Sequence, residues 1–164
     1  MTTFQVYEPI PTGEYSATIE SAELKVQANP FDPEGDPSRR WHIKCVLLNS
    51  EQSGRTLMGF FNDVLSKKSN LWKNFALPLF GEWARENEVY VDLCAGLNVN
   101  IVVVEGVDKE GDPNNSVTLF KPVAVAFRNP RYNTEHAKKA MLARSERETL
   151  EAVPSLPATA EVPA

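Results

Sequence analysis

Two runs of apolar and aromatic residues, joined by a short polar segment, constrain the fold of this chain most strongly. The runs cover residues 41–48 and 55–62, and the polar segment between them includes Gly54. Two such runs around a glycine-containing turn are typical of an antiparallel β-hairpin. The sequence therefore predicts a hairpin over residues 38–62.

The first strand of this hairpin separates its side chains onto two faces, because successive residues of a strand point to opposite sides. One face carries Trp41, Ile43, Cys45 and Leu47. His42 and Lys44 lie on the other face. Trp41 therefore either packs in the core with its apolar neighbours or stacks on a ligand, and the pattern leaves both open.

Positive charge is concentrated on the hairpin and on the segment that follows it. Residues 38–73 hold seven Lys/Arg and two Asp/Glu, whereas residues 1–37 hold one and seven, and the whole chain has a net charge of −5. A local basic field attracts polyanions even on an acidic protein. One interpretation is an ordinary strand pair with solvated basic side chains, and the other is a platform for single-stranded nucleic acid.

In the nucleic-acid interpretation, the basic side chains meet phosphates and the aromatic ones stack on bases. The candidate phosphate-binding residues are Arg39, Arg40, Lys44, Arg55, Lys67 and Lys68. The candidate stacking residues are Trp41, Phe60 and Phe61.

The segments on either side of the hairpin also have clear signals. A strand is predicted over residues 15–26, with a slip in its alternation after Ile19 that indicates a β-bulge. Apolar residues at three- and four-residue spacing predict helix over residues 70–86, with Trp72 and Trp83 in the core. Pro78 divides this segment into two short helices that meet near Leu77, because proline fits the first turn of a helix and not its interior.

The second half of the chain predicts another hairpin and then a polar helix. Residues 96–105 and 116–126 form the two strands, separated by a turn that contains glycine and proline. Asn133 and Thr134 are candidate caps for a helix over residues 135–151. The last thirteen or so residues contain three prolines and few large apolar side chains, so we expect disorder there.

Together these elements predict a mainly β protein. Five strands with a helical insertion between the third and fourth suit an OB-fold-like barrel, which is small and partly open. The predicted organisation is a leader over residues 1–12, the barrel over residues 13–127, a polar C-terminal helix over residues 128–151 and a disordered tail over residues 152–164.

Several classes of function lack their sequence signals. No run approaches the roughly 20 apolar residues of a membrane helix, and the first residues lack a signal peptide. We therefore expect a cytoplasmic protein whose two cysteines, Cys45 and Cys94, are reduced core residues. No Cys/His spacing suits zinc, and no phosphate-binding loop or catalytic motif is present. The acidic residues in the turns at 32–36 and 108–112 are expected to be solvated, so neither an enzyme nor a metal or cofactor site is predicted.

A resemblance to a known family rests on short motifs spread over residues 9–123. The matching segments are residues 11–19 (PTGEYSATI), 54–57 (GRTL), 60–61 (FF), 95–99 (AGLNV), 115–117 (NSV) and 121–122 (KP). In these the chain resembles a family of small tailed-phage proteins that are encoded near replication and recombination genes. The resemblance implies an OB-fold, a single-stranded-DNA-binding-like role and, if the chain is phage-encoded, a location in the host cytoplasm.

Two functions from different classes follow. The first is sequence-tolerant binding of single-stranded DNA in phage replication or recombination, with other replication or recombination proteins as partners of the C-terminal tail. The second is a non-enzymatic protein-interaction or virion accessory module that keeps the barrel. Either function is compatible with a homo-oligomer.

Overall fold

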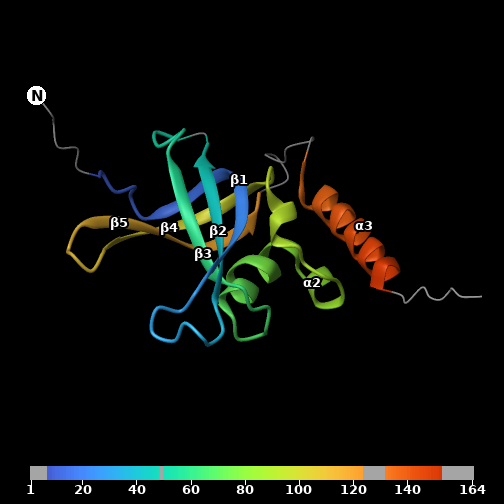
Figure 1. The fold of residues 1–164 in the computed structure, drawn as a ribbon. Coiled ribbons are helices and arrows are strands. Elements are labelled where there is room, and N and C mark those ends of the chain that lie inside the picture. Colours follow the sequence, from blue (N-terminus) through green and yellow to red (C-terminus); the bar gives the residue numbers. More distant parts are fainter. Residues whose placement is uncertain (1–6, 49, 124–131, 153–164) are drawn as a thin grey trace, which may run out of the picture.

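The computed structural model describes residues 7–48, 50–123 and 132–152 and forms a five-stranded antiparallel sheet (Figure 1). The strands are β1 (Gly13–Gln27), β2 (Ser38–Leu47), β3 (Thr56–Asn62), β4 (Asn98–Val107) and β5 (Pro113–Pro122), in the order β3-β2-β1-β4-β5. The helical segments are η1 (Trp72–Ala76), α1 (Leu77–Phe80), α2 (Trp83–Glu86), η2 (Val91–Cys94) and α3 (Thr134–Ala152). The predicted mainly β class, both hairpins, the helical insertion after the third strand and the C-terminal helix are confirmed.

Strand β1 contains the predicted bulge. Ile19 lies opposite Cys45 of β2, but the next paired residue is Ser21, opposite Lys44, so Glu20 is one extra residue on the β1 side. An extra residue bends a strand and increases its twist. Before the bulge β1 lies between β2 and β4, whereas after it β1 pairs, among the described strands, with β2 alone.

The sheet curls but does not close into a barrel. Strands β3 and β5 are the two ends of the strand order and still contact each other. Gly59 of β3 permits this approach, because a Cβ atom there would lie 3.1 Å from ring atoms of Phe120 on β5. No hydrogen-bonded pairing joins β3 to β5 in the part of the chain that the structure describes, so the sheet remains open.

Three phenylalanines join the helical insertion to the two ends of the sheet. Phe75 of η1 lies 5.1 Å from Phe120 of β5 and 5.9 Å from Phe61 of β3, measured between ring centroids. All three rings are buried. Their tilted and edge-on arrangement is the one that aromatic quadrupoles favour.

The helical insertion divides where proline predicted it to divide. Pro78 lies in the first turn of α1, and η1 ends immediately before Leu77. The backbone N–H of Leu77 bonds to the carbonyl of Trp72, five residues back, which widens the turn ahead of the proline. A second break follows at Gly81, whose φ of 62° is readily adopted only by glycine.

Helix α3 begins at the predicted cap and is docked through a narrow apolar stripe. The side-chain oxygen of Asn133 accepts the backbone N–H of His136 at 3.1 Å, as an N-cap residue does. Ala137 and Met141 are fully buried, and the helix contacts η2 and α1. The polar helix is therefore part of the folded body.

The N-terminal leader holds a buried anchor that its sequence did not predict. The side chain of Ile10 is fully buried. The amide side chain of Asn115 on β5 both accepts the N–H of Ile10 and donates to its carbonyl, each at 2.8 Å. Residues 7–12 thus belong to the folded body, whereas residues 1–6 lie outside the described residues. Of the predicted tail over residues 152–164, Ala152 is the last residue of α3 and the rest lies outside the described residues.

We predict that Phe120→Ala lowers the free energy of unfolding by about 3–5 kcal/mol, because it empties the aromatic cluster that links β5, η1 and β3. Urea unfolding followed by circular dichroism measures this change. The control is Phe60→Ala, on the opposite face of the sheet, for which we expect a loss below about 1 kcal/mol. Equal losses for the two variants would contradict this assignment of the core.

Candidate nucleic-acid interface

The outward face of β1, β2 and β3 holds two of the six predicted basic residues, Arg40 and Lys44. Pairing across the three strands arranges their side chains in rows. One row is Lys25, Arg40 and Asn62; the next is Glu23, His42 and Phe60; the third is Ser21, Lys44 and Met58. The apolar alternate residues of the same strands point inward to the core.

Phe60 is the exposed aromatic side chain of this face. Its residue is 45% exposed, and His42 lies edge-on to its ring at 4.9 Å between centroids. The guanidinium carbon of Arg40 lies 5.0 Å from the ring centroid. The quadrupole of an aromatic ring attracts a cation at that distance. An accessible ring beside a cation is the combination that binds a nucleobase and its phosphate.

A shallow groove of about 450 Å³ begins beside Phe60. Arg40 and Phe60 line it from the sheet, and Lys68 lines it from the loop after β3. Arg40 and Lys68 form no ion pair with any residue in the described part of the chain. The groove therefore presents two uncompensated cations next to an exposed ring. We call Arg40, His42, Phe60 and Lys68 the Phe60 face.

The other two candidate stacking residues lie on the inward side of the sheet. Phe61 is 4% exposed and belongs to the aromatic cluster of the core, so its ring is taken up by packing, although the residue also borders the groove. Trp41 is half-buried against the core, and its indole N–H donates to the carboxylate of Asp63 at 2.9 Å. The assignment of Phe61 as a stacking residue is corrected, because strand alternation places odd-numbered residues of β2 and β3 inside. Trp41 lies on the same side but keeps part of its surface exposed.

Two of the predicted phosphate-binding residues are paired with carboxylates. The Nε atom of Arg39 lies 3.2 Å from Asp63, and the ammonium of Lys44 lies 3.2 Å from Glu20. These side chains are partly exposed, so the pairs are weak and screened. The Lys44 pair still reduces the positive charge that the outward face offers to a polyanion, whereas Arg39 lies on the side of the strand that carries Trp41.

Arg55 lies at the far end of the β2–β3 hairpin and serves the leader. Its guanidinium donates to the side chain of Gln52 and to the carbonyl of Glu8, and lies 5.3 Å from the ring centroid of Tyr7. The structure thus separates Arg55 from the Phe60 face and gives it a role in holding residues 7–12.

Lys67 and Lys68 are both exposed but face different hollows. Lys68 lines the groove of the Phe60 face, whereas Lys67 lines a second hollow of about 640 Å³ with Trp72 and Arg85. The two lysines are consecutive in the loop after β3, so the loop spreads positive charge over both surfaces.

Two features of this region were not predicted from the sequence. His42 joins the site as the edge-on neighbour of Phe60, and its position beside Lys44 on the outer face was the only sequence signal for it. Phe31, in the loop between β1 and β2, is 95% exposed. An aromatic residue between prolines in an acidic loop carries no periodicity, so its exposure could not be read from the pattern.

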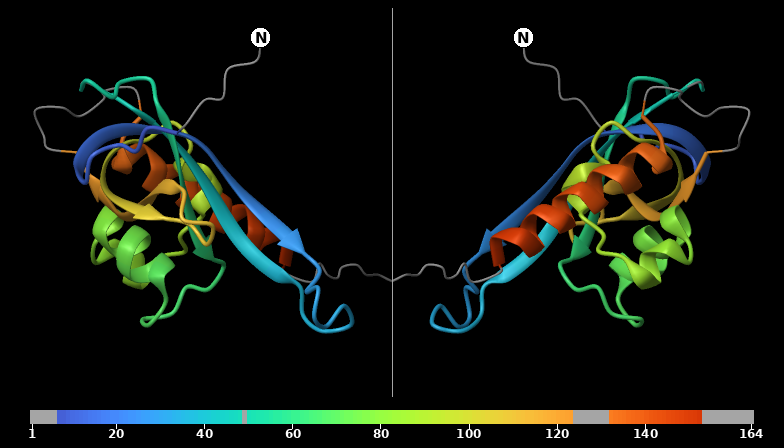
Figure 2. Two further views of the ribbon diagram at one scale, coloured as in Figure 1. Left: turned by 90° about the vertical axis from the view of Figure 1, so that its left-hand side faces the viewer. Right: turned by 90° about the vertical axis from the view of Figure 1, so that its right-hand side faces the viewer.

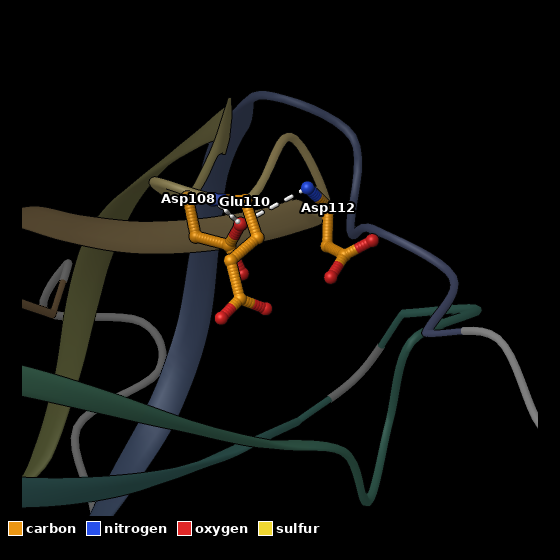
Figure 3. Close-up of side chains that lie close together, drawn as sticks. All are labelled: Asp108, Glu110 and Asp112. Atoms are coloured by element: carbon orange, nitrogen blue, oxygen red, sulfur yellow. Dashed lines mark hydrogen bonds between the residues drawn. The ribbon is translucent and has the colours of Figure 1, made fainter.

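The acidic residues of the β4–β5 turn come together in space (Figure 3). Ligand atoms of Asp108, Glu110 and Asp112 lie within 4.8 Å of one another. The Asp108 carboxylate, however, accepts the backbone N–H groups of Glu110 at 2.9 Å and of Asp112 at 3.0 Å. The three side chains are exposed, and closure of the turn accounts for their proximity without an ion.

Comparisons with protein-family models, with curated proteins and with solved structures find no match to this chain. None of the helices in the described ranges is long and apolar enough to cross a membrane.

Cys45 and Cys94 are buried free thiols and are not part of the Phe60 face. Both residues have no exposed surface, and neither forms a disulfide. Burial raises the pKa of the Cys45 thiol to about 12 and also raises the pKa of Cys94 well above its ordinary value, with the nearby Asp92 carboxylate adding to the second shift. Both groups are therefore protonated at neutral pH.

We predict that neither thiol of the folded protein reacts measurably with Ellman's reagent at pH 8, because the thiolate is the nucleophile and burial suppresses it. In denaturant both thiols should react within minutes. Absorbance at 412 nm follows the reaction. Rapid modification of a folded thiol would mean that the core around it opens.

Proposed function

We propose that this protein binds single-stranded DNA with little sequence preference, through the Phe60 face. The observation that carries the proposal is the exposed ring of Phe60 with the Arg40 guanidinium 5.0 Å from its centroid and Lys68 in the same groove. A ring of this kind stacks on any base, and the cations meet the phosphates on either side of it.

The arrangement of strands and helices in the structure also supports this proposal. The order β3-β2-β1-β4-β5, the contact between the end strands and the helices between β3 and β4 fit a partly open, OB-like barrel. We propose this description of the fold and, with the phage-family resemblance, a role in DNA replication or recombination. The helical insertion packs on the inward side of the sheet through Phe75, so it leaves the outward face of β2 and β3 uncovered (Figure 1).

The second candidate is a protein-interaction or accessory module without a nucleic-acid role. Its supporting observation is the compensation of charge on the hairpin, where Arg39 and Lys44 already have carboxylate partners in a chain of net charge −5. Of these two candidate functions, only DNA binding predicts affinity for labelled oligo-dT at low salt.

We predict that Arg40→Ala with Lys68→Ala weakens binding to oligo-dT and flattens its dependence on salt. Each phosphate contact contributes a log–log slope of about 0.7 on single strands, so the double variant should lose about 1–2 units of slope. Fluorescence anisotropy titrations at several salt concentrations measure both quantities. The charge-matched control is Lys139→Ala with Arg147→Ala on exposed positions of α3, which should leave the slope unchanged.

If the two double variants lose the same slope, binding follows overall charge and the Phe60 face is not the site. If the folded wild-type protein has no affinity for oligo-dT at low salt, the accessory-module function takes the place of DNA binding.

We predict that Phe60→Ala removes about 1–3 kcal/mol of binding free energy while changing the salt slope little, because stacking on a base releases no counterions. The same anisotropy titration measures the loss. Phe60→Trp serves as the matched control, since it keeps a larger ring at the same position and should retain affinity. Unchanged affinity of Phe60→Ala would exclude a stacking role for this ring.

A further inference from the structure

The second half of β1 has one unpartnered edge. Its pairing with β4 covers residues 13–18, whereas its pairing with β2 continues to Gln27. The strand therefore leaves the centre of the sheet at the bulge and runs on with β2 as an arm (Figure 2). Along residues 21–27 no strand among the described residues pairs with β1 on the side away from β2.

The direction of the backbone groups on this edge follows from the hydrogen bonds that the structure records. Leu47 exchanges backbone hydrogen bonds with the β2–β3 turn, so the inward-facing residues of β2 point their N–H and C=O groups toward β3. The outward-facing residues of β2 then point theirs toward β1, because these directions alternate along a strand. Their partners are the outward-facing residues Ser21, Glu23 and Lys25. The polar groups of Ala22, Leu24 and Val26 therefore point to the unpartnered edge.

We propose that this edge binds the same edge of a second copy of the chain, antiparallel and centred on Leu24. In that register Leu24 faces Leu24 of the partner subunit, and Ala22 faces Val26 across the two-fold axis. These are the residues whose N–H and C=O groups point outward from the edge, so each pair exchanges hydrogen bonds. The contact uses the same residues on both copies, as a two-fold interface requires.

Charge selects this register over its neighbours. With Leu24 at the centre, Glu23 of each copy lies opposite Lys25 of the other, which is favourable. A register centred on Glu23 places the Glu23 side chains of the two copies opposite each other, and a register centred on Lys25 does the same with the two lysines. Like charges directly opposite each other are unfavourable. Registers centred on Ala22 or Val26 shorten the paired segment. Registers that mix inward- and outward-facing residues are excluded by the pleat.

The side chains of Glu23 and Lys25 already interact within one chain. The ammonium of Lys25 lies 3.0 Å from the carboxylate of Glu23, and both side chains are at least half exposed. The hydrogen bond and the charge of Lys25 hold the pKa of Glu23 below its ordinary value. Pairing of two copies replaces this contact by equivalent contacts between copies.

The inward side of the same segment also gains from a second copy. Val26 is 51% exposed and Leu24 is half-buried, although both belong to the apolar face on which Ala17, Ile19 and Ala22 are buried. A partner strand brings a second Leu24 and Val26 to this face, so it extends the apolar surface and covers what one copy leaves exposed.

The test is self-association of the full chain, measured by sedimentation velocity over a range of concentrations. The wild-type protein should show a monomer–dimer equilibrium. Glu23→Lys and Lys25→Glu should each raise the dimer dissociation constant by about tenfold, because each makes both cross-strand pairs repulsive. Combining the two changes in one chain restores opposite charges and should restore dimerisation. Mixing the two single variants should likewise produce a heterodimer.

Two controls separate this interface from others. Glu14→Lys makes the same change of charge on the part of β1 that β4 covers, and it should leave the dimer unchanged. Hydrogen exchange followed by mass spectrometry should show slower exchange in residues 22–26 as protein concentration rises. Circular dichroism checks that each variant is folded.

A wild-type protein that stays monomeric at all concentrations overturns the proposal, and the alternating charges then protect the edge from association. A dimer that responds equally to Glu14→Lys and Glu23→Lys, or that leaves exchange in residues 22–26 unchanged, also overturns it. These outcomes are independent of oligo-dT binding, since the Phe60 face lies on other residues.

Discussion

The extra residue at Glu20 is the constraint on which the rest of the structure depends. It keeps the apolar residues of β1 on the inner face, although their sequence parity changes after Ile19. The bend that comes with a bulge allows one strand to serve two partners, β4 before it and β2 beyond it. The end strands β3 and β5 of the curled sheet meet where Phe120 approaches Gly59. The unpartnered edge of β1 begins directly after this position.

Alternation along β2 and β3 divides the hairpin into a structural side and a solvent side. The inward residues complete the core with the helical insertion, which buries Phe61 and covers part of Trp41. The outward residues have no such role, and yet one of them is a large aromatic ring held beside a guanidinium. Exposing a phenylalanine forgoes the free energy of its burial. Binding of a base would recover that free energy, which is why the face suits a ligand.

The two proposals combine in a simple geometry. Pairing through β1 would join the outward faces of two copies into one surface, with a Phe60 face toward each end. Two linked sites on one strand of DNA bind far more tightly than either alone, provided that the strand can span them. The dimer would therefore raise affinity for long strands more than for short ones. The acidic loop between β1 and β2 would lie beside this surface and limit where a polyanion can pass.

Local patterns in the sequence determined the elements, whereas packing between distant segments decided the site. Alternation and turn residues predicted both hairpins, the slip after Ile19 predicted the bulge, and Pro78 and Asn133 marked helix boundaries, because each acts within a few residues of itself. Alternation divides Trp41, Phe60 and Phe61 between two faces, but which face is buried depends on the core that Phe75 and Phe120 build from other elements. For the same reason the sequence did not predict the carboxylate partners of Arg39 and Lys44, the hydrogen bond of Arg55 to the leader or the burial of Ile10. Such contacts join residues far apart along the chain, and only the folded sheet brings them within reach.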